Sequence, residues 1–416
     1  MRFNPFRPNS IVGPGMFAGR LEEINTVEQC LFQTKHGNPQ HFLIQGERGI
    51  GKSSLFLVVE RLASGKWKHI DNAHFNFLTI SVDIGGAEDQ VDLIRAIAKD
   101  LRREIDSRDQ VKKNAGAVWD FITNWEVMGV RYHKATESQA DDARDLLVDN
   151  FVKLANDHRI EIDGICVLID EADGPAESTK LGEFVKLFTE RLSRRDCNRV
   201  LLGVAGLPTV IPKLRASHES SPRVFETMKL APLEHSEREY VVNRGLEDAL
   251  KVNKVETKIS RDALRMISSL SEGYPHFVQQ FAYYAFEEDK DNNIDVQDVV
   301  RGAYKENGAL MQLGSKYFDE MYFSKISSES YRKVLDTMAE YGDAWVSRKD
   351  LIQKSGIKET TINNALNTLK SKNIIVLDEA RQGFYRLPTK SFAAWIKAIN
   401  SLRGRASRRG LDDIFA

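Results

Sequence analysis

The stretch Gly46-Glu-Arg-Gly-Ile-Gly-Lys-Ser53 matches the pattern G-x-x-x-x-G-K-[ST] in full. It follows an apolar run at residues 41–45, typical of a buried strand, and precedes residues 52–63, typical of a helix with one apolar face. Glycines let such a loop turn its N–H groups inward around a phosphate, and the start of the helix adds its positive end. The stretch therefore predicts a phosphate-binding loop between a strand and a helix.

Each position of this loop has an expected role toward a bound nucleoside triphosphate. Lys52 is expected to reach the β- and γ-phosphates and to act in catalysis, and the Ser53 hydroxyl is expected to be a ligand of Mg²⁺. The other nucleotide-binding residues are expected along the loop: Gly46, Glu47, Arg48, Gly49, Ile50, Gly51 and Ser54. The alternative is a glycine-rich turn beside an ordinary lysine.

A second apolar run, Gly164-Ile-Cys-Val-Leu-Ile-Asp170, ends in the two carboxylates Asp170 and Glu171. A continuous apolar run predicts a central parallel strand that is covered on both faces. Asp170 is then expected in the Mg²⁺ shell, and Glu171 is expected to orient or deprotonate the attacking water. The alternative is a strand that simply ends in solvated acids.

Residues 36–232 alternate between strand and helix patterns, which predicts an α/β fold with a parallel sheet. Strands are expected at 41–45, 76–83, 164–170, 198–206 and 224–230, and helices at 52–63, 88–105, 138–157 and 178–194. Residues 123–132 are compatible with a short hairpin.

Beyond Ser236 the pattern becomes helical, with helices expected at 236–250, 260–271, 275–288 and 295–306 and with Ser236 and Ser260 as N-caps. Three further helices and two short strands, 373–377 and 383–387, predict a winged helix. The expected order is a lead-in at 1–20, an α/β core at 21–232, a helical lid at 233–308, a linker helix at 309–325, a winged-helix domain at 326–402 and a basic flexible tail at 403–416.

Composition indicates a large globular protein. The 416 residues carry a net charge of −1 and contain no apolar run of 18 residues, so no membrane span is expected. The first residues have no apolar signal core, and the three cysteines show neither metal spacing nor a disulfide framework. A cytoplasmic, reduced location is expected.

Together these motifs resemble those of AAA+ ATPases, in particular the archaeal-type origin-recognition initiators and their bacterial relatives. The resemblance is carried by the phosphate loop, Phe17-Ala-Gly-Arg20, Ile169-Asp-Glu-Ala172, Ser271-Glu-Gly-Tyr-Pro-His-Phe277 and the C-terminal winged helix. It implies an AAA+ α/β core, an all-α lid and a winged-helix domain. It also implies ATP and Mg²⁺ as cofactors, hydrolysis of ATP to ADP and phosphate, and self-association through the core.

The resemblance also assigns roles to single residues. Phe17 would lie near the adenine, Arg223 would be an arginine finger for a neighbouring subunit, and His276 would stand in for the second-sensor arginine. The alternatives are a loop residue, a surface arginine and a helix-capping histidine. The expected polar first sensor is absent from 200–207, with Thr209 as the next polar side chain. Hydrolysis is therefore expected to be slow or stimulated by a partner.

Residues 326–416 hold 16 Lys and Arg against 10 Asp and Glu, a net charge of +6, which favours nucleic-acid binding. The expected recognition helix, 359–370, would leave polar side chains outside to contact duplex DNA, and the wing would add one cation. The expected DNA contacts are Thr360, Thr361, Asn364, Lys370 and Arg381. The alternative is a winged helix that docks a protein.

The leading hypothesis is an ATP-dependent switch that binds DNA, in a setting of replication initiation, a mobile element or defence. The alternative is a signal-transducing ATPase whose output is a partner protein, with the winged helix as a docking or autoinhibitory module. A DNA-driven motor is less favoured, because the fourth core strand lacks its polar sensor.

Overall fold

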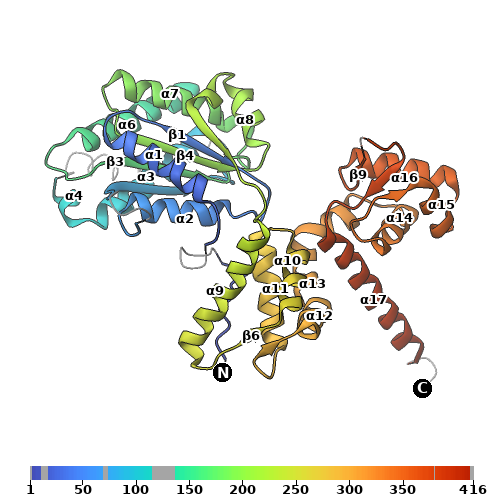
Figure 1. Ribbon diagram of the computed structural model, residues 1–416. Coiled ribbons are helices and arrows are strands. Elements are labelled where there is room, and N and C mark those ends of the chain that lie inside the picture. The colour runs from blue at the N-terminus through green and yellow to red at the C-terminus, as the bar shows by residue number, and fades with distance from the viewer. Residues whose placement is uncertain (1, 11–16, 69–73, 115–135, 379, 413–416) are drawn as a thin grey trace. The chain divides into compact units, whose positions relative to one another are not determined.

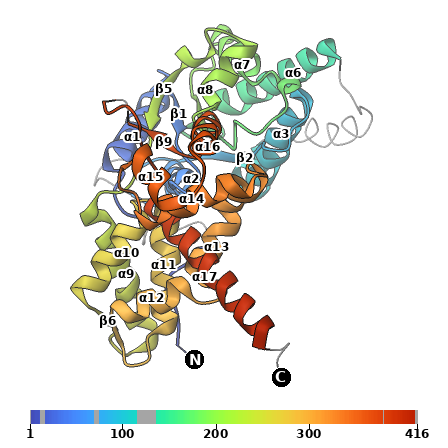
Figure 2. The ribbon, with the colours of Figure 1, turned by 90° about the vertical axis from the view of Figure 1, so that its right-hand side faces the viewer.

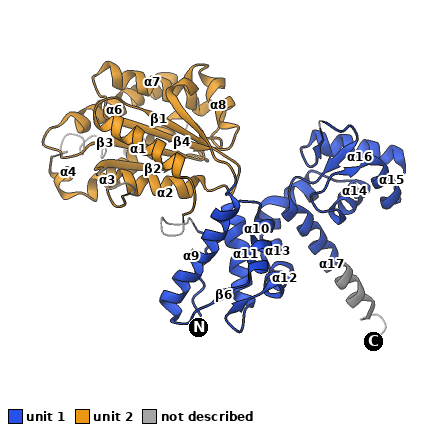
Figure 3. Ribbon diagram, in the orientation of Figure 1, with its two compact units in different colours: residues 1–10, 232–416 blue, residues 11–231 orange. Residues whose placement is uncertain are grey.

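The computed structural model describes residues 2–10, 17–68, 74–114, 136–378 and 380–412, with side chains described up to residue 401. The chain forms two compact units (Figure 3). Residues 11–231 make one unit, and residues 1–10 join residues 232–416 in the other. The hairpin expected at 123–132 lies outside the described residues.

The 11–231 unit is built on a parallel sheet with the strand order β2-β3-β4-β1-β5 (Figure 1). Neighbouring strands are in register, so Asp83 lies opposite Asp170 at the end of the β2–β3 pair. The strands are β1 (His41–Gln45), β2 (Phe77–Asp83), β3 (Gly164–Asp170), β4 (Val200–Gly206) and β5 (Phe225–Lys229). The predicted α/β fold is confirmed, and the carboxyl ends of all these strands share one edge of the sheet, where α/β proteins bind ligands.

Helices cover both faces of this sheet, as parallel strands require. On one face Ile80, Val167 and Val204 belong to a hydrophobic core that also includes side chains of α3, α6, α7 and α8. On the other face the ring of Phe42 in β1 packs against that of Phe56 in α2, with centroids 6.4 Å apart. The helices are α1 (Leu21–Lys35), α2 (Lys52–Ala63), α3 (Gln90–Asp106), α4 (Asp109–Asn114), α6 (Glu137–Asn156), α7 (Leu181–Arg194) and α8 (Val210–Ser217).

The lid is helical, as predicted, and the caps explain where its helices begin. The Ser260 hydroxyl accepts a hydrogen bond from the main-chain N–H of Ala263, as expected of an N-cap. Ser236 is not the other cap, because the N-cap position of α9 is Glu234, two residues earlier, whose main-chain N–H donates to Oε2 of Glu237 at 2.7 Å. The lid comprises α9 (His235–Asn253), α10 (Arg261–Ser271), α11 (Pro275–Glu288), α12 (Val296–Tyr304) and the short strands β6 (Lys258–Ile259) and β7 (Asn293–Ile294).

The C-terminal part has the element order predicted for a winged helix, seen from a second side in Figure 2. Its antiparallel sheet has the order β8-β10-β9, so β8, next to the second helix, joins the two predicted strands. The elements are α14 (Glu329–Glu340), β8 (Val346–Ser347), α15 (Arg348–Ser355), α16 (Glu359–Ser371), β9 (Val376–Leu377), β10 (Phe384–Arg386) and α17 (Lys390–Asp412).

The helix α17 is longer than expected and continues to Asp412, through most of the predicted flexible tail at 403–416. Arginine, alanine and leucine are strong helix formers, and no proline interrupts this segment. No helix in the described part of the chain is both long and apolar enough to cross a membrane.

The lid and the winged helix are joined by α13 (Ala309–Leu313) and two π-helical turns, which replace the expected regular linker helix. The first π-turn starts at Gly314, where a Cβ would collide with the indole of Trp395 in α17. Trp395 also packs at 5.7 Å from Phe318, measured between ring centroids. The close approach of two helices at this aromatic joint explains both the glycine and the irregular turn.

The strand that leads into the phosphate loop begins with a buried histidine, His41. Its Nδ1 accepts a hydrogen bond from the main-chain N–H of Leu202 in β4, at 3.1 Å. Burial lowers the pKa of His41 from 6.5 to about 4. The imidazole is therefore neutral at pH 7 and links β1 to β4.

We expect this histidine to make the stability of the 11–231 unit depend on pH. Because its folded pKa lies below the unfolded value, the stability from neutral His41 is present above about pH 6.5 and is lost as pH falls toward 4. At ~1.4 kcal/mol per pH unit, the loss at pH 5 is about 2 kcal/mol. Hydrogen exchange of the β1 and β4 amides at pH 7 and pH 5 measures it. His41→Asn keeps an acceptor but does not titrate, so an unchanged pH dependence in this variant would contradict the assignment.

Candidate nucleotide site

The phosphate loop occupies the carboxyl end of β1 and leads directly into α2, as predicted. Gly49 and Gly51 have φ angles of 79° and 99°, in the left-handed region that favours glycine. Gly46 is held close to the loop, since a Cβ on it would lie 2.7 Å from Cγ2 of Ile50. Of the other expected contacts, Glu47 and Arg48 are exposed and Ser54 is half-buried. The sequence therefore builds a tight turn that ends at a helix N-terminus.

Lys52, the first residue of α2, folds its amine back over this turn. Its Nζ donates hydrogen bonds to the main-chain oxygens of Gly46, at 2.8 Å, and Glu47, at 3.1 Å. Burial lowers the pKa of Lys52, and the nearby carboxylates act in the opposite sense. The ammonium group is thus held at the loop, where a phosphate oxygen would meet it.

Ser53 and Asp170, predicted as Mg²⁺ ligands, lie side by side. The Ser53 hydroxyl donates to Oδ2 of Asp170 at 2.7 Å, and Oδ1 of Asp170 accepts from the main-chain N–H of Glu171 at 2.8 Å. A hydroxyl and a carboxylate offer oxygen donors, and Mg²⁺ bound to a nucleotide takes few protein ligands beside phosphate and water. The residues therefore fit the ion that the sequence predicted.

Glu171 follows Asp170 with a left-handed backbone, at a φ of 52°. Its pKa is raised, first by the neighbouring carboxylate of Asp83, then by burial and by Asp170 and Asp173, while Arg48 acts in the opposite sense. Gly85 lies against it, because a Cβ there would collide with Oε2 of Glu171. Glu171 thus stands in a group of acids at the strand ends.

Asp83 and Gly85 were not predicted as site residues. An Asp at the end of an expected strand, followed within two positions by glycines, is a signal that the sequence contains. The signal becomes informative only with the strand order, since Asp83 reaches Glu171 because β2 pairs with β3.

The resemblance would place a polar first sensor at the end of β4, where this sequence has none. The polar group at this place comes instead from Asp173, in the loop after β3. Its Oδ1 accepts from the main-chain N–H of Leu207 at 2.7 Å, and its carbonyl accepts from Nζ of Lys213 at 2.8 Å. Gly206 permits this contact, since a Cβ on it would lie 2.9 Å from Oδ1 of Asp173. The apolar end of β4 is thus capped from the loop that follows β3.

The Phe17-Ala-Gly-Arg20 segment reaches the loop through its arginine. Arg20 donates to the main-chain oxygen of Ile50 at 3.2 Å and forms an ion pair with Glu23 at 3.5 Å. Phe17 is half-buried. The contact from Arg20 to the loop was not predicted, and the role of Phe17 near an adenine stays a prediction.

The structure does not bring Arg223 to the phosphate loop of the same unit. Arg223 is exposed in a short turn at the amino end of β5, which is the opposite edge of the sheet from the loop. This placement is compatible with a finger that acts on a neighbouring subunit, which stays a prediction.

His276 lies in the other unit, in the first turn of α11. Burial, together with Lys316, lowers its pKa to about 4, and within the described residues its Nε2 has no hydrogen-bond partner. The ring packs 5.5 Å from that of Tyr317. A neutral imidazole could donate or accept a hydrogen bond but would lack the charge of a sensor arginine.

The expected DNA contacts lie on the winged-helix surface. Ile362, Leu366 and Leu369 are buried on the core face of α16, as predicted. Thr360, Asn364, Lys370 and Arg381 are exposed, and Thr361 is half-buried. Arg381 pairs with Asp378 at 2.7 Å.

Comparisons with known proteins fit this geometry. The family model described as "AAA ATPase domain" matches residues 16–201. The "Uncharacterized HTH-type transcriptional regulator MJ0774" of Methanocaldococcus jannaschii is 24% identical over 261 residues, and the match covers 60% of this chain and 58% of that protein. This chain thus matches less than two thirds of the length of that curated relative.

Two solved structures of Aeropyrum pernix proteins are similar over nearly the whole chain. The ORC2 protein, solved as ADPNP–ADP complexes, has a TM-score of 0.52 and 16% identity, covering 97% of this chain and 99% of that one. The ORC1 protein in complex with DNA has a TM-score of 0.44 and 14% identity, covering 93% and 94%. At this identity the likeness to ORC2 shows a shared fold.

Replacing Asp83 with asparagine should lower the pKa of Glu171 toward its ordinary value, because it removes the first cause of the upward shift. The ¹³C chemical shift of the Glu171 carboxyl group, followed through a pH titration, measures this change. The matched control is Asp196→Asn, because Asp196 precedes β4 at the far edge of the sheet and its φ of 53° suits asparagine. If the Glu171 carboxyl group titrated identically in Asp83→Asn and the parent, the effect of Asp83 on the pKa of Glu171 would be contradicted.

Proposed function

We propose that this protein is an ATP-dependent switch that binds duplex DNA through its winged helix, and the match of residues 16–201 to the family described as AAA ATPase domain supports the nucleotide part. The observation that carries the nucleotide part is the 2.7 Å hydrogen bond between Ser53 and Asp170, next to the Lys52 amine and the glycine turn. Two residues 117 positions apart thereby form one oxygen-donor pair at the mouth of a phosphate loop. A structural role alone would not require this convergence.

The triphosphate would be held by the backbone N–H groups of residues 46–51 and by the start of α2. Lys52 would exchange its contacts with the Gly46 and Glu47 carbonyls for phosphate oxygens. Ser53 and Asp170 would hold Mg²⁺, which, when bound, neutralises charge on the phosphates. The ion would also separate the hydroxyl from the carboxylate that it contacts in the structure.

Hydrolysis would rely on Glu171 as the base that orients water and accepts its proton. The raised pKa, caused first by Asp83, improves the match between this carboxylate and a proton taken up near neutral pH. The apolar β4 offers no side chain to position the water, since Asp173 is already bonded to Leu207. We therefore propose slow turnover that suits a switch, with Arg223 of a neighbouring copy as the accelerating cation.

The DNA part of the proposal is supported by the winged-helix surface. The α16 helix presents Thr360, Asn364 and Lys370 to solvent, and amide and hydroxyl groups can contact adenine edges, phosphates or a thymine methyl. The net charge of +6 over residues 326–416 adds attraction to phosphates. The similarity to the regulator MJ0774, by its printed name a helix-turn-helix protein, also supports the proposal of DNA binding.

Removing the loop amine tests the nucleotide site. Lys52→Ala should weaken the binding of Mg²⁺-ATP about 30-fold or more, because truncating one partner of a desolvated charge pair costs about 2 kcal/mol or more. Calorimetric titration of ATP into the full chain measures the affinity. Lys68→Ala, which removes an exposed lysine outside the loop, should bind as the parent does. Equal affinity in parent and Lys52→Ala would refute the assigned site.

Two neutral substitutions and one charge change test the DNA surface. Thr361→Ala with Asn364→Ala should weaken duplex binding about tenfold or more, because each lost base contact costs about 1–3 kcal/mol. Lys370→Ala should lower the slope of log affinity against log salt by about 1. Fluorescence anisotropy with labelled duplex, over a salt series with and without ATP, measures both. Lys153→Ala in the other unit removes the same charge as a control.

If the parent bound ATP but no duplex at any salt concentration, the DNA part would fail. The output would then be a partner protein docked on the winged helix. An ATP-dependent change in affinity for duplex separates the switch from a constitutive DNA-binding protein.

A further inference from the structure

Arg348, the first residue of α15, extends its side chain to α16, the predicted recognition helix. Its Nη1 donates a hydrogen bond to Oδ1 of Asn363 at 3.0 Å and lies 3.6 Å from Oε1 of Glu359. The main chain of Arg348 is fixed as well, because its N–H donates to the carbonyl of Gly383, just before β10, at 2.8 Å. Arg348 therefore links α15, α16 and the two-stranded wing.

The hydrogen bond from Arg348 determines which way the amide group of Asn363 faces. A guanidinium group contains only donors, so the amide atom that faces Arg348 must be the oxygen. The amide nitrogen is on the other branch of the same group, and it makes no hydrogen bond within the described part of the chain. Asn363 is half-buried, and its nitrogen is not one of the buried unpaired atoms among the described residues. Asn363 thus offers N–H donors to solvent while its acceptor is engaged.

Asn363 lies in the middle of the exposed face of α16. Thr360, Asn367 and Lys370 are three, four and seven positions away, so they share its side of the helix. All three of these neighbours are exposed. Two of the proposed DNA contacts, Thr360 and Lys370, therefore flank Asn363, and a duplex bound on this face would meet the Asn363 amide.

The charge of Arg348 is offset by its neighbour on α16. Glu359 precedes Asn363 by one helical turn, and its carboxylate lies beside the guanidinium group. This pair has no net charge, so it adds little to the attraction of the surface for phosphates. The effect of Arg348 on a bound duplex is therefore exerted through the orientation of Asn363.

We propose that Arg348 is a positioning residue that sets the base preference of the proposed DNA surface. An unrestrained asparagine reads adenine with two hydrogen bonds, in which its oxygen accepts from N6 and its nitrogen donates to N7. With its oxygen turned to Arg348, Asn363 can only donate. Guanine, which presents the adjacent acceptors N7 and O6, fits such a group best, and cytosine, which presents the N4 donor, fits it worst. This inference rests on the proposed DNA binding and specifies the base that the surface selects.

Selection of bound duplexes from a random library by the full chain, followed by sequencing, tests the proposal. Asn363→Ala identifies the base position that Asn363 reads, because the preference is lost at that position alone. We expect the parent to favour guanine there. Arg348→Met keeps most of the side-chain length but removes the donor, so it frees the amide. At the same position it should raise the preference for adenine over guanine about fivefold or more, the lower end for one bidentate contact.

Lys349→Met is the matched control, because Lys349 is exposed, follows Arg348 directly and carries the same charge. It should leave the guanine preference as it is in the parent. Asn363→Asp is a second, independent variant. Its carboxylate keeps an acceptor toward Arg348 but replaces the outward N–H donors with an oxygen, so the preference should change from guanine to cytosine.

The same base preference in Arg348→Met and the parent, at the position identified by Asn363→Ala, would overturn the positioning role and leave the proposed function intact. If Asn363→Ala altered the preference at no position, Asn363 would not read a base and the inference would fail. A parent that bound no duplex would instead overturn the proposed DNA binding, and this inference with it.

Discussion

The hydrogen bond from Ser53 to Asp170 depends on the order of the strands. Ser53 follows β1 and Asp170 ends β3, and the sheet places β4 between these two strands. The two side chains meet at 2.7 Å because both reach across the end of β4. That strand ends in Val204, Ala205 and Gly206, which carry no polar side chain.

The strand order also brings several negatively charged side chains together at one edge of the sheet. Asp83, Asp170 and Asp173 all act on Glu171 there, and together with burial they raise the pKa of Glu171. Lys52 offsets part of this charge but is itself drawn into a buried position that lowers its pKa. Repulsion among these carboxylates destabilises the fold when no cation is bound, and a bound cation would reduce this repulsion. A cation that binds only the folded state stabilises that state by mass action. The repulsion among the acids is thus linked to the proposed binding of Mg²⁺ with ATP.

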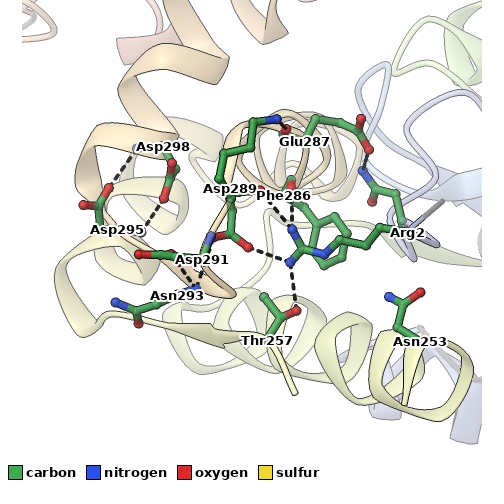
Figure 4. A network of polar contacts seen from close by, with 12 residues as sticks. Arg2, Asn253, Thr257, Phe286, Glu287, Asp289, Asp291, Asn293, Asp295 and Asp298 are labelled. Atoms are coloured by element: carbon green, nitrogen blue, oxygen red, sulfur yellow. Dashed lines mark hydrogen bonds and ion pairs between the residues drawn. The ribbon is translucent and has the colours of Figure 1, made fainter. Parts of the chain in front are cut away.

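The sequence predicted what is local and missed what depends on distant partners. The phosphate loop, the apolar strands and the Ser260 cap follow from neighbouring residues, so the parallel sheet and the lid helices could be expected. Asp83 could not be assigned, because its partner Glu171 is brought near by the pairing of β2 with β3. Residues 1–20 were expected to form only a lead-in, since nothing near Arg2 in sequence indicates that its partner is Asp289 (Figure 4). The length of α17 was missed because a run of arginines resembles a flexible tail.

Packing within the 1–10 and 232–416 unit limits how the lid can move. Phe277, next to His276, lies 5.1 Å from Tyr317, and Phe318 in turn lies 5.2 Å from Phe392 of α17, measured between ring centroids. The Glu272 carboxylate accepts two hydrogen bonds from Ser391, one from its main-chain N–H and one from its hydroxyl. Close-packed aromatic contacts do not deform gradually. A displacement of the turn at His276 must therefore carry the winged helix with it or break this joint, and either event would change the position of the α16 surface.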